Sequence, residues 1–342
     1  MIKIHTQFQQ FQQDKHFGLF EDFVNSHAFG NFFQSSSCFQ YLEDVPGYAP
    51  FLITSHDESG AIQGSLLGVF QSNGSNIKSW FSRRLIVWGG PLVKQSDETI
   101  QHKIAHELIQ TLNQHATGKA IYIEFRNFFD TTAYRNVFEA SGFQFKEHLN
   151  YLVKTDEEAA VRKRVSKSRM RQIKSSLNAG ATIAEAASKE EVITFYGILE
   201  KLYKEKVKKP LPALELFLKL RESPAAKLFV VKHEEQVVGG ILCPIFNDTI
   251  IYEWYVCGED GLIKGLHPSV LATWAPIEFG LKNNYSHFDF MGAGKPDQDY
   301  GVREFKARFG GEEVGYGRYE KIVNKSLYKA GKLGLKLYQS IK

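Results

Sequence analysis

The chain has 342 residues, about twice the roughly 150 residues of one domain, so two domains are expected. Apolar residues make up 43% and charged residues 23% of the chain, an ordinary globular composition that excludes a disordered chain. The 42 basic and 38 acidic side chains leave a net charge of +4. This balance excludes a globally basic nucleic-acid binder, so any basic site must come from local clustering.

Local sequence features argue against a metal- or disulfide-stabilised protein and against a secreted or membrane-spanning one. Cys38, Cys243 and Cys257 are too far apart for a metal knuckle or a disulfide framework, and the histidines lack ligand spacing, so no metal is expected. The first residues contain no apolar segment of the signal-peptide type. No run reaches the roughly 18 apolar residues of a membrane span. We expect a soluble protein of the cytoplasm.

In chain order, the second half repeats the first weakly. Residues 51–70 read as two strands joined by a polar turn, and residues 228–246 repeat this pattern. Each hairpin is followed by a helix with one apolar face and then a short strand: residues 99–115 and 120–125, and residues 268–283 and 286–291. We predict an α+β fold with domains at 1–155 and 156–342, each a mixed, mostly antiparallel sheet flanked by helices.

A β-meander, a helix and a further strand are the layout of the GNAT acyltransferase fold, in which the central strands splay around the acyl carbonyl. In that fold, a loop of the type Arg/Gln-x-x-Gly-x-Gly/Ala holds the CoA pyrophosphate with backbone amides and a helix N-terminus. The corresponding residues, Leu262 to His267, keep one glycine but lack the leading cation and the last small residue. The sequence therefore predicts two tandem GNAT-like domains with a degenerate CoA loop.

A basic segment lies between residues 161 and 174. On a single helix, four cations fall at i, i+3, i+7 and i+10 and share one face: Arg164, Lys167, Arg171 and Lys174. Like charges at this spacing repel unless an anion neutralises them. The segment is either a solvated helix face or a phosphate-binding stripe for a nucleotide-linked substrate or RNA.

Glycines and aromatic residues gather between residues 288 and 311. A strand that carries Asp289 ends in glycines, which allow a ligand or another backbone to approach closely. Lys306 follows Phe305 among aromatic residues, which favours a partly buried position in a cleft. The alternative is an ordinary exposed lysine.

The segment from Trp274 to Gly311 resembles the Fem family of non-ribosomal peptidyltransferases, which includes FemX, FemA and FemB. The matching features are Asp289 on its Gly-ended strand, Tyr300-Gly301, Phe305-Lys306 and Phe309-Gly310-Gly311. The resemblance implies transfer of an aminoacyl group from aminoacyl-tRNA to an amine of a peptidoglycan precursor. It implies that Lys306 stabilises the oxyanion in a cleft that Phe305 shapes.

The resulting site prediction has two parts. The catalytic candidates are Lys306, Phe305 and Asp289, and the substrate-binding candidates are Arg164, Lys167, Arg171, Lys174, Tyr203, Lys206, Tyr255 and Tyr300. We expect no tightly bound cofactor, and aminoacyl-tRNA or acyl-CoA as co-substrate. We expect Lys306→Met to lower turnover by orders of magnitude and to leave the fold intact.

Two alternatives remain open at this stage. The first is an acyl-CoA-dependent N-acyltransferase that acts on an amino sugar or a polysaccharide precursor. The second is a non-catalytic protein that keeps the fold and binds RNA or another anion. The expected partners are a nucleotide- or lipid-linked envelope precursor and tRNA. The basic segment 321–342 predicts either a packed terminal helix or peripheral contact with the inner face of the membrane.

Overall fold

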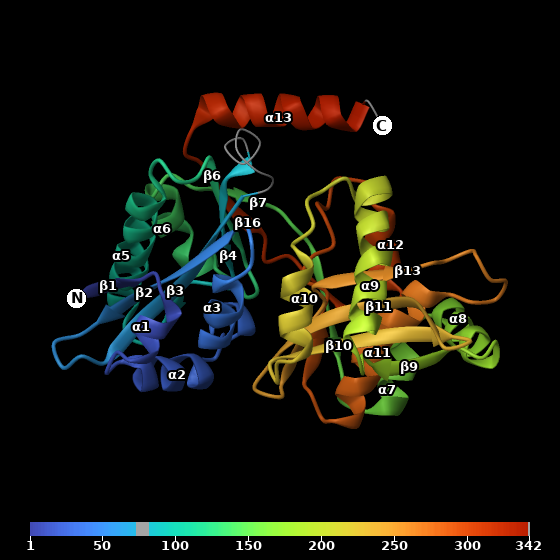
Figure 1. Cartoon of the computed structure of the whole chain (residues 1–342). Coiled ribbons are helices and arrows are strands. Elements are labelled where there is room, and N and C mark those ends of the chain that lie inside the picture. The colour runs from blue at the N-terminus through green and yellow to red at the C-terminus, as the bar shows by residue number, and fades with distance from the viewer. Residues whose placement is uncertain (73–81, 341–342) are drawn as a thin grey trace. The chain divides into compact units, whose positions relative to one another are not determined.

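The computed structural model describes residues 1–72 and 82–340, and the chain divides into two compact units (Figure 1). The first unit comprises Met1–Glu147 and Tyr316–Lys342, and the second comprises His148–Gly315. Each unit contains one mixed sheet with flanking helices, so the predicted α+β fold of two domains with mixed sheets is confirmed.

In the described part of the first unit, the sheet has the order β1-β2-β3-β4-β6-β16-β7, and β5 pairs with β3. Its long antiparallel hairpin is β2 and β3, while β4 and β6 are parallel. The strands are β1 (Ile2–His5), β2 (Tyr48–His56), β3 (Ile62–Gln71), β4 (Arg84–Trp88), β5 (Leu92–Val93), β6 (Tyr122–Arg126), β7 (Gln144–Lys146) and β16 (Arg318–Ile322).

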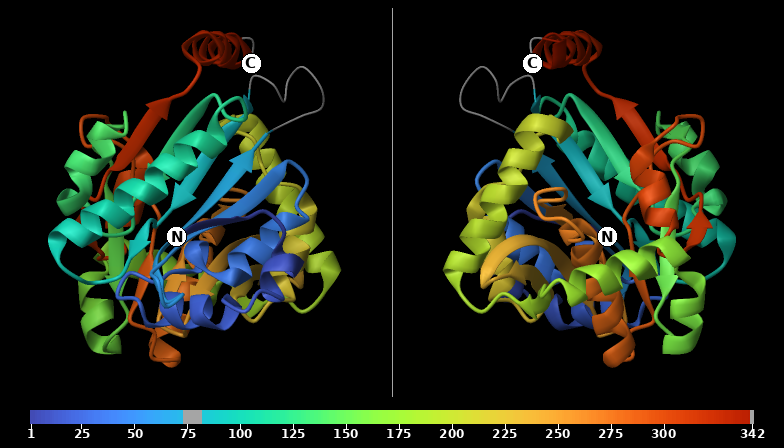
Figure 2. Two further views of the ribbon diagram at one scale, coloured as in Figure 1. Left: turned by 90° about the vertical axis from the view of Figure 1, so that its left-hand side faces the viewer. Right: turned by 90° about the vertical axis from the view of Figure 1, so that its right-hand side faces the viewer.

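Helix α5 covers one face of the first unit's sheet, as Figure 2 shows. Its apolar residues, spaced three or four apart, pack on the strands, as the sequence pattern predicts. The described helical elements of this unit are α1 (Phe8–Gln12), α2 (Phe17–Ser26), η1 (Phe32–Gln34), α3 (Ser36–Glu43), α5 (Glu98–Ala116), η2 (Thr132–Tyr134), α6 (Arg135–Ala140) and α13 (Lys325–Ser340).

The sheet of the second unit has the order β15-β8-β14-β12-β11-β10-β9, and β13 pairs with β11. Its strands are β8 (Asn150–Lys154), β9 (Thr182–Glu185), β10 (Ala226–His233), β11 (Gln236–Phe246), β12 (Ile250–Tyr252), β13 (Tyr255–Gly258), β14 (His287–Asp289) and β15 (Glu312–Val314). Its helical elements are α7 (Glu158–Arg164), α8 (Lys167–Asn178), α9 (Lys189–Leu202), η3 (Tyr203–Val207), α10 (Leu214–Arg221), α11 (Pro268–Lys282) and α12 (Gly301–Ala307). Buried residues of α11, among them Leu271, Trp274 and Ile277, contribute to its core.

The internal repeat is visible in the topology. In the first unit the hairpin β2–β3 is followed by β4, α5 and a strand parallel to β4, and in the second unit β10–β11 is followed by β12, α11 and a strand parallel to β12. The two compact units differ from the predicted domains, residues 1–155 and 156–342, in two places. Strand β8 pairs with β14 of the second unit, and β16 pairs with β6 and β7 of the first unit.

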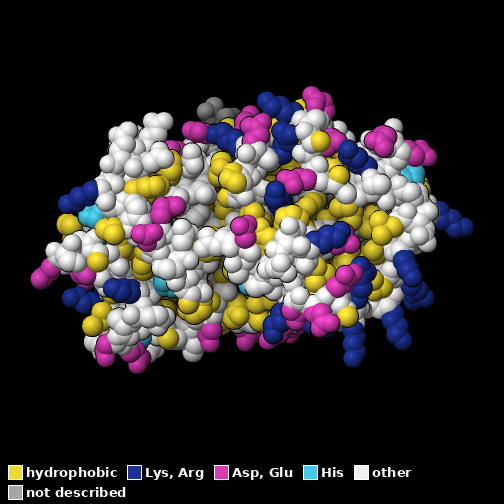
Figure 3. Space-filling view, turned by 90° about the horizontal axis from the view of Figure 1, so that it is seen from below, with side chains coloured by type: hydrophobic (Ala, Val, Ile, Leu, Met, Phe, Trp, Pro, Cys, Tyr) yellow, Lys and Arg dark blue, Asp and Glu magenta, His cyan; other side chains and the backbone are white. Residues whose placement is uncertain are grey.

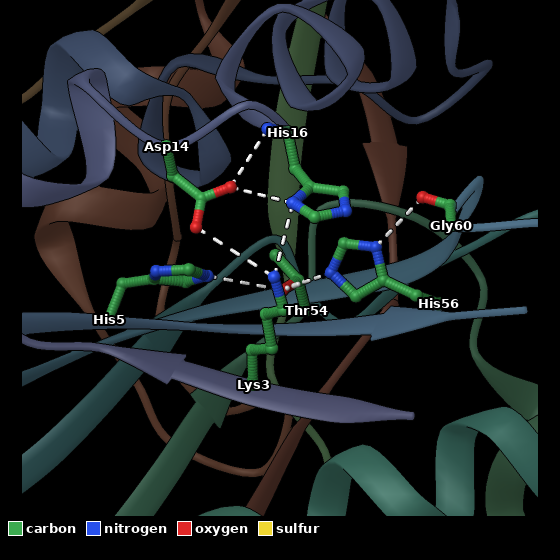
Figure 4. A network of polar contacts seen from close by, with 7 residues as sticks. All are labelled: Lys3, His5, Asp14, His16, Thr54, His56 and Gly60. Atoms are coloured by element: carbon green, nitrogen blue, oxygen red, sulfur yellow. Dashed lines mark hydrogen bonds and ion pairs between the residues drawn. The ribbon is translucent and has the colours of Figure 1, made fainter.

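A polar network fixes the N-terminal strand of the first unit (Figure 4). Asp14 Oδ1 lies 2.6 Å from Nδ1 of His16, which also contacts Lys3 Nζ at 3.1 Å. Thr54 Oγ1 lies between Nε2 of His56, at 2.8 Å, and Nε2 of His5, at 3.3 Å. Burial lowers the pKa of His5 to about 4, so this ring is neutral at neutral pH.

Helix α13 begins three residues after the last residue of β16. The hydroxyl of Tyr328 donates to Glu320 Oε1 at 2.6 Å, which anchors the first turn of the helix to the sheet. Residues 341–342 of the predicted membrane-contact segment lie outside the described residues, and that contact stays a prediction. Within residues 1–72 and 82–340, no helix has both the length and the apolar character needed to cross a bilayer.

Candidate active site

Two neighbouring strands of the second unit separate at the candidate site. β12 and β14 are parallel and paired up to Tyr252 and Asp289. The amide of Glu253 still donates to the carbonyl of Asp289 at 2.8 Å, whereas the amide of Trp254 donates to Leu242 on β11. Beyond this point β14 loses β12 as a partner while it keeps β8 on its other edge, so the backbone carbonyls of Phe290 and Gly292 need other donors.

The ammonium group of Lys306 supplies those donors. Lys306 lies on α12 and is only 9% exposed. Its Nζ donates to the carbonyl oxygens of Phe290 at 2.9 Å and Gly292 at 2.8 Å, and it lies 2.7 Å from Glu253 Oε1. All three ammonium protons therefore have an acceptor. The predicted burial of Lys306 is observed, and its catalytic role stays a prediction.

Glu253 is the site residue that sequence reasoning missed. Its side chain is buried, and Oε2 has no hydrogen-bond partner among the described residues. Burial raises the pKa of this carboxyl, Lys306 opposes that rise, and the nearby charge of Asp289 adds to it. The sequence signal that could have identified Glu253 is that it is the single carboxylate inside an apolar strand segment, residues 250–256.

Asp289 shapes the turn that follows β14. Its Oδ1 accepts hydrogen bonds from Asn150 Nδ2 at 2.7 Å and from the amide of Met291 at 2.6 Å. Asn150 Oδ1 in turn accepts from the amide of Gly292 at 2.7 Å. Burial outweighs these bonds and raises the pKa of Asp289 to about 6. Through Asn150, the carboxylate of Asp289 thus holds the backbone of Gly292, whose carbonyl oxygen Lys306 binds.

Arg169 connects α8 to the helix that carries Lys306. Its guanidinium carbon lies 4.1 Å from the ring centroid of Phe305, and Nη2 donates to the carbonyl of Phe305 at 3.4 Å. A second ring, that of Phe309, lies 5.2 Å away. Because Arg169 is almost fully buried, these contacts fix the C-terminal end of α12.

The prediction of one continuous basic helix is wrong. Val165 is extended, and Ser166 begins a second helix by accepting a hydrogen bond from the amide of Arg169. The chain after α12 packs at this break: the amide of Ser166 donates to the carbonyl of Arg308 at 2.9 Å, and a Cβ on Gly310 would lie 2.5 Å from the carbonyl of Arg164. Arg164 therefore lies on α7, where its Nη2 is 2.7 Å from Asp156 Oδ1.

Helix α8 keeps the other three cations of the predicted stripe. Lys167, Arg171 and Lys174 are all exposed and follow at i, i+4 and i+7. Figure 3 shows Lys and Arg side chains projecting from the end of the second unit where α8 lies in Figure 1. Their proposed role in phosphate binding stays a prediction.

The aromatic candidates lie in two places. The rings of Tyr203 and Tyr255 are 6.2 Å apart, and Tyr255 also meets Phe217 at 5.1 Å, so these two candidates are brought together. Lys206, in η3, is exposed. Tyr300 is 42% exposed and packs on Gly294, where a Cβ would lie 2.7 Å from its ring.

In the described residues, no cluster of histidine, cysteine or acidic side chains suits a metal ion.

Comparisons with known proteins agree with this architecture. Residues 162–306 match the family model of an acetyltransferase (GNAT) domain. No curated protein matches the chain in sequence. Among solved structures, FemX matches with a TM-score of 0.68 and 15% identity, over 96% of this chain and 99% of FemX.

Two further solved structures share the fold. The C-terminal domain (DUF2156) of a putative lysylphosphatidylglycerol synthetase from Agrobacterium fabrum matches with a TM-score of 0.57 and 11% identity, over 96% of both chains. A tandem GNAT protein from the clavulanic acid biosynthesis pathway matches with a TM-score of 0.56 and 10% identity, over 94% of this chain and 99% of that one. The predicted resemblance to the Fem family is thus confirmed for the fold: the chain has the tandem GNAT fold, and its residues 162–306 match the model of an acetyltransferase (GNAT) domain.

Proposed function

We propose that the second unit transfers an acyl group from an ester donor to the amine of an acceptor and so forms an amide. The observation that carries this proposal is the buried pair of Lys306 and Glu253 where β12 and β14 separate. In the GNAT fold the acyl carbonyl lies in this opening. A cation and a carboxylate placed there are the two groups that aminolysis of an ester requires.

Each group has a defined task in the reaction. The amine nitrogen attacks the carbonyl carbon, the ester C–O bond breaks, and the amine loses a proton. Glu253 Oε2, which has no partner among the described residues, accepts that proton and passes it to the leaving ester oxygen, which departs as a hydroxyl group. Lys306 stabilises the negative charge on the carbonyl oxygen, and it exchanges one of its two carbonyl acceptors for that oxygen.

The first turn of α11 favours an aminoacyl-tRNA donor over acyl-CoA. In GNAT domains this helix N-terminus holds the CoA pyrophosphate. Here the carboxylate of Asp260 accepts hydrogen bonds from the amide and the hydroxyl of Ser269, so a negative charge already caps the helix. We expect Asp260→Asn to strengthen acyl-CoA binding at least several-fold, measured by calorimetry, while unchanged affinity would contradict this account of the helix.

The acceptor in this proposal is an amine of a nucleotide- or lipid-linked envelope precursor, as the Fem resemblance implies, and the reaction takes place in the cytoplasm. The test measures amide formation with an aminoacyl-tRNA and, separately, with an acyl-CoA, using a UDP-linked muropeptide as acceptor. Ribonuclease should abolish activity with the first donor. Product from acyl-CoA alone would replace the aminoacyl proposal with the acyl-CoA alternative.

Glu253→Gln tests the proton acceptor directly. We expect kcat to fall about 10²–10⁴-fold, because general-base catalysis contributes that much. The matched control is Glu222→Gln, an exposed carboxylate at the end of α10. If Glu253→Gln turns over as fast as the control, Glu253 is not the proton acceptor.

A non-catalytic anion-binding protein is the second candidate. The observation that favours it is that every proton of Lys306 already has an acceptor within the protein, as a purely structural lysine would. In that case RNA binding survives in Lys306→Met/Glu253→Leu, which leaves no unpaired charge in the core, and falls with Arg171→Glu on the exposed face of α8. Loss of turnover with intact RNA binding in Lys306→Met/Glu253→Leu would instead support the enzyme.

A further inference from the structure

A loop of the second unit carries an apolar tip beside helix α8. Leu262 and Ile263 form this tip and are 71% and 37% exposed. Gly261 and Gly265 bracket it, and their φ values of +89° and +83° allow the tight turns on either side. Ser175 Oγ on α8 donates to the carbonyl of Gly265 at 2.8 Å, so the tip lies next to the helix.

The loop is anchored on both sides of its tip. Before the tip, the carboxylate of Asp260 accepts hydrogen bonds from the amide and the hydroxyl of Ser269. After the tip, Leu266 is buried in the core, and the amide of His267 donates to Ser176 Oγ on α8 at 2.9 Å. Two large aliphatic side chains are therefore held in solvent by a loop that is tethered at both ends.

Exposed cations border the tip: Lys167, Arg171 and Lys174 of α8, and Lys264 of the loop. These four side chains form no ion pair among the described residues, and α8 contains no acidic residue. Carboxylates occur at the edges, from Glu259 and Asp260 before the tip and from Glu234 and Glu235 in the β10–β11 turn, which reaches the end of α8. The positive charge of α8 is thus left without a partner on the helix itself.

The chemistry of this surface suits lipid better than RNA. Proteins that bind single-stranded nucleic acid stack bases on aromatic side chains as well as contacting phosphates with cations. The sequence of α8 and of residues 259–266 contains no aromatic residue. Aliphatic side chains beside lysine and arginine are instead typical of segments that lie at the boundary between lipid headgroups and acyl chains.

We propose that α8 and residues 261–264 form a docking surface for a membrane that contains anionic lipids. Leu262 and Ile263 enter the boundary between headgroups and acyl chains, and the bordering cations contact lipid phosphates. The opposite face of α8 carries Arg169, which contacts Phe305 on the helix of Lys306. Docking itself requires no acyl transfer, so this inference goes beyond the function proposed above.

Flotation of the full chain with lipid vesicles tests this surface. We expect binding to vesicles of phosphatidylcholine and phosphatidylglycerol, and binding at least tenfold weaker to phosphatidylcholine alone. Leu262→Ser/Ile263→Ser should weaken binding about tenfold, because two aliphatic side chains no longer leave water. Arg171→Gln/Lys174→Gln should weaken it about fivefold for each cation removed. All four side chains are exposed, so the melting temperature of both variants should equal that of the parent.

The matched controls lie on α9 of the same unit. Ile193→Ser removes an aliphatic side chain that is 50% exposed, Lys201→Gln removes an exposed cation, and both should bind as the parent does. Absence of binding to the mixed vesicles, equal binding to both kinds of vesicle, or equal binding by the loop variant and the parent would each overturn the proposal.

An oligonucleotide and a soluble acceptor complete the test. Oligonucleotide binding that falls only in Arg171→Gln/Lys174→Gln, without vesicle binding by the parent, would replace the lipid with RNA. Amide formation on a UDP-linked muropeptide needs no membrane, so its rate should be the same in the loop variant and the parent. Failure of docking and failure of the acyl-transfer role of Lys306 are therefore distinguishable.

Discussion

Replacing Lys306 with methionine should destabilise the protein as well as stop turnover. The change removes the donor from the carbonyls of Phe290 and Gly292 and leaves the carboxylate of Glu253 buried without its cation. Leaving one partner of a buried ion pair costs about 3–5 kcal/mol, and each unsatisfied carbonyl adds about 1 kcal/mol or more. The total is comparable with the 5–15 kcal/mol by which domains are typically stable.

A double-mutant cycle separates the cost of the unpaired Glu253 carboxylate from the cost of the two unsatisfied carbonyl groups. In Lys306→Met/Glu253→Leu the buried carboxylate is gone, so the double variant should recover about 3–5 kcal/mol relative to Lys306→Met. Neither variant should recover turnover. Urea unfolding measures the free energies, and amide formation measures activity.

The matched control is Lys282→Met, because that lysine is exposed and pairs with Glu278, one turn earlier on α11. Its free energy of unfolding should change by less than about 1 kcal/mol. The reasoning fails if Lys306→Met is as stable as this control, or if the double variant is no more stable than Lys306→Met. The first result would mean that the pair contributes little to the fold and that the expectation of an intact protein was right. The second would mean that the unpaired carboxylate of Glu253 is not the source of the lost stability.

Two other predictions concern stability. Because burial lowers the pKa of His5 from 6.5 to about 4, the native protein binds fewer protons than the unfolded chain between these pH values. Its free energy of unfolding should therefore fall as pH drops from 6.5 to 4, and His5→Gln should flatten that slope, while an unchanged slope would exclude His5 as the cause. Gly310→Ala should cost about 2–4 kcal/mol, because φ is +77° and the new Cβ would meet the carbonyl of Arg164 at 2.5 Å. Gly197→Ala in α9, where nothing lies within 4 Å, is the control and should stabilise by up to about 1 kcal/mol, so equal melting temperatures for the two variants would refute the clash.

The repeated core of each unit could be predicted from sequence because its signals are local. Hairpins and apolar helix faces appear in short windows, so β2–β3, β10–β11, α5 and α11 were all expected. The domain limits could not be predicted in the same way. Strands β8 and β16 pair with partners far away in the chain, and no local pattern indicates which sheet accepts them.

The candidate site was predictable only in part. Lys306 was found through a motif resemblance, and its burial agrees with the aromatic residues around it in sequence. Glu253 was missed because a glutamate in a strand is usually a solvent-facing residue, and its burial depends on the separation of β12 from β14. The break before Ser166 was missed because the basic pattern suits a helix, whereas Gly310, a residue distant in sequence, is the one that packs there.

The position of β16 has a consequence for synthesis of the protein. This strand lies between β6 and β7 in the first unit, yet it is translated after the whole second unit. Without residues 318–322, β6 and β7 both present unpaired edges, whereas the second unit already has all of its strands. The N-terminal unit is therefore the last to complete its sheet, and a released chain that ends at residue 315 should hold a folded second unit and an incomplete first one.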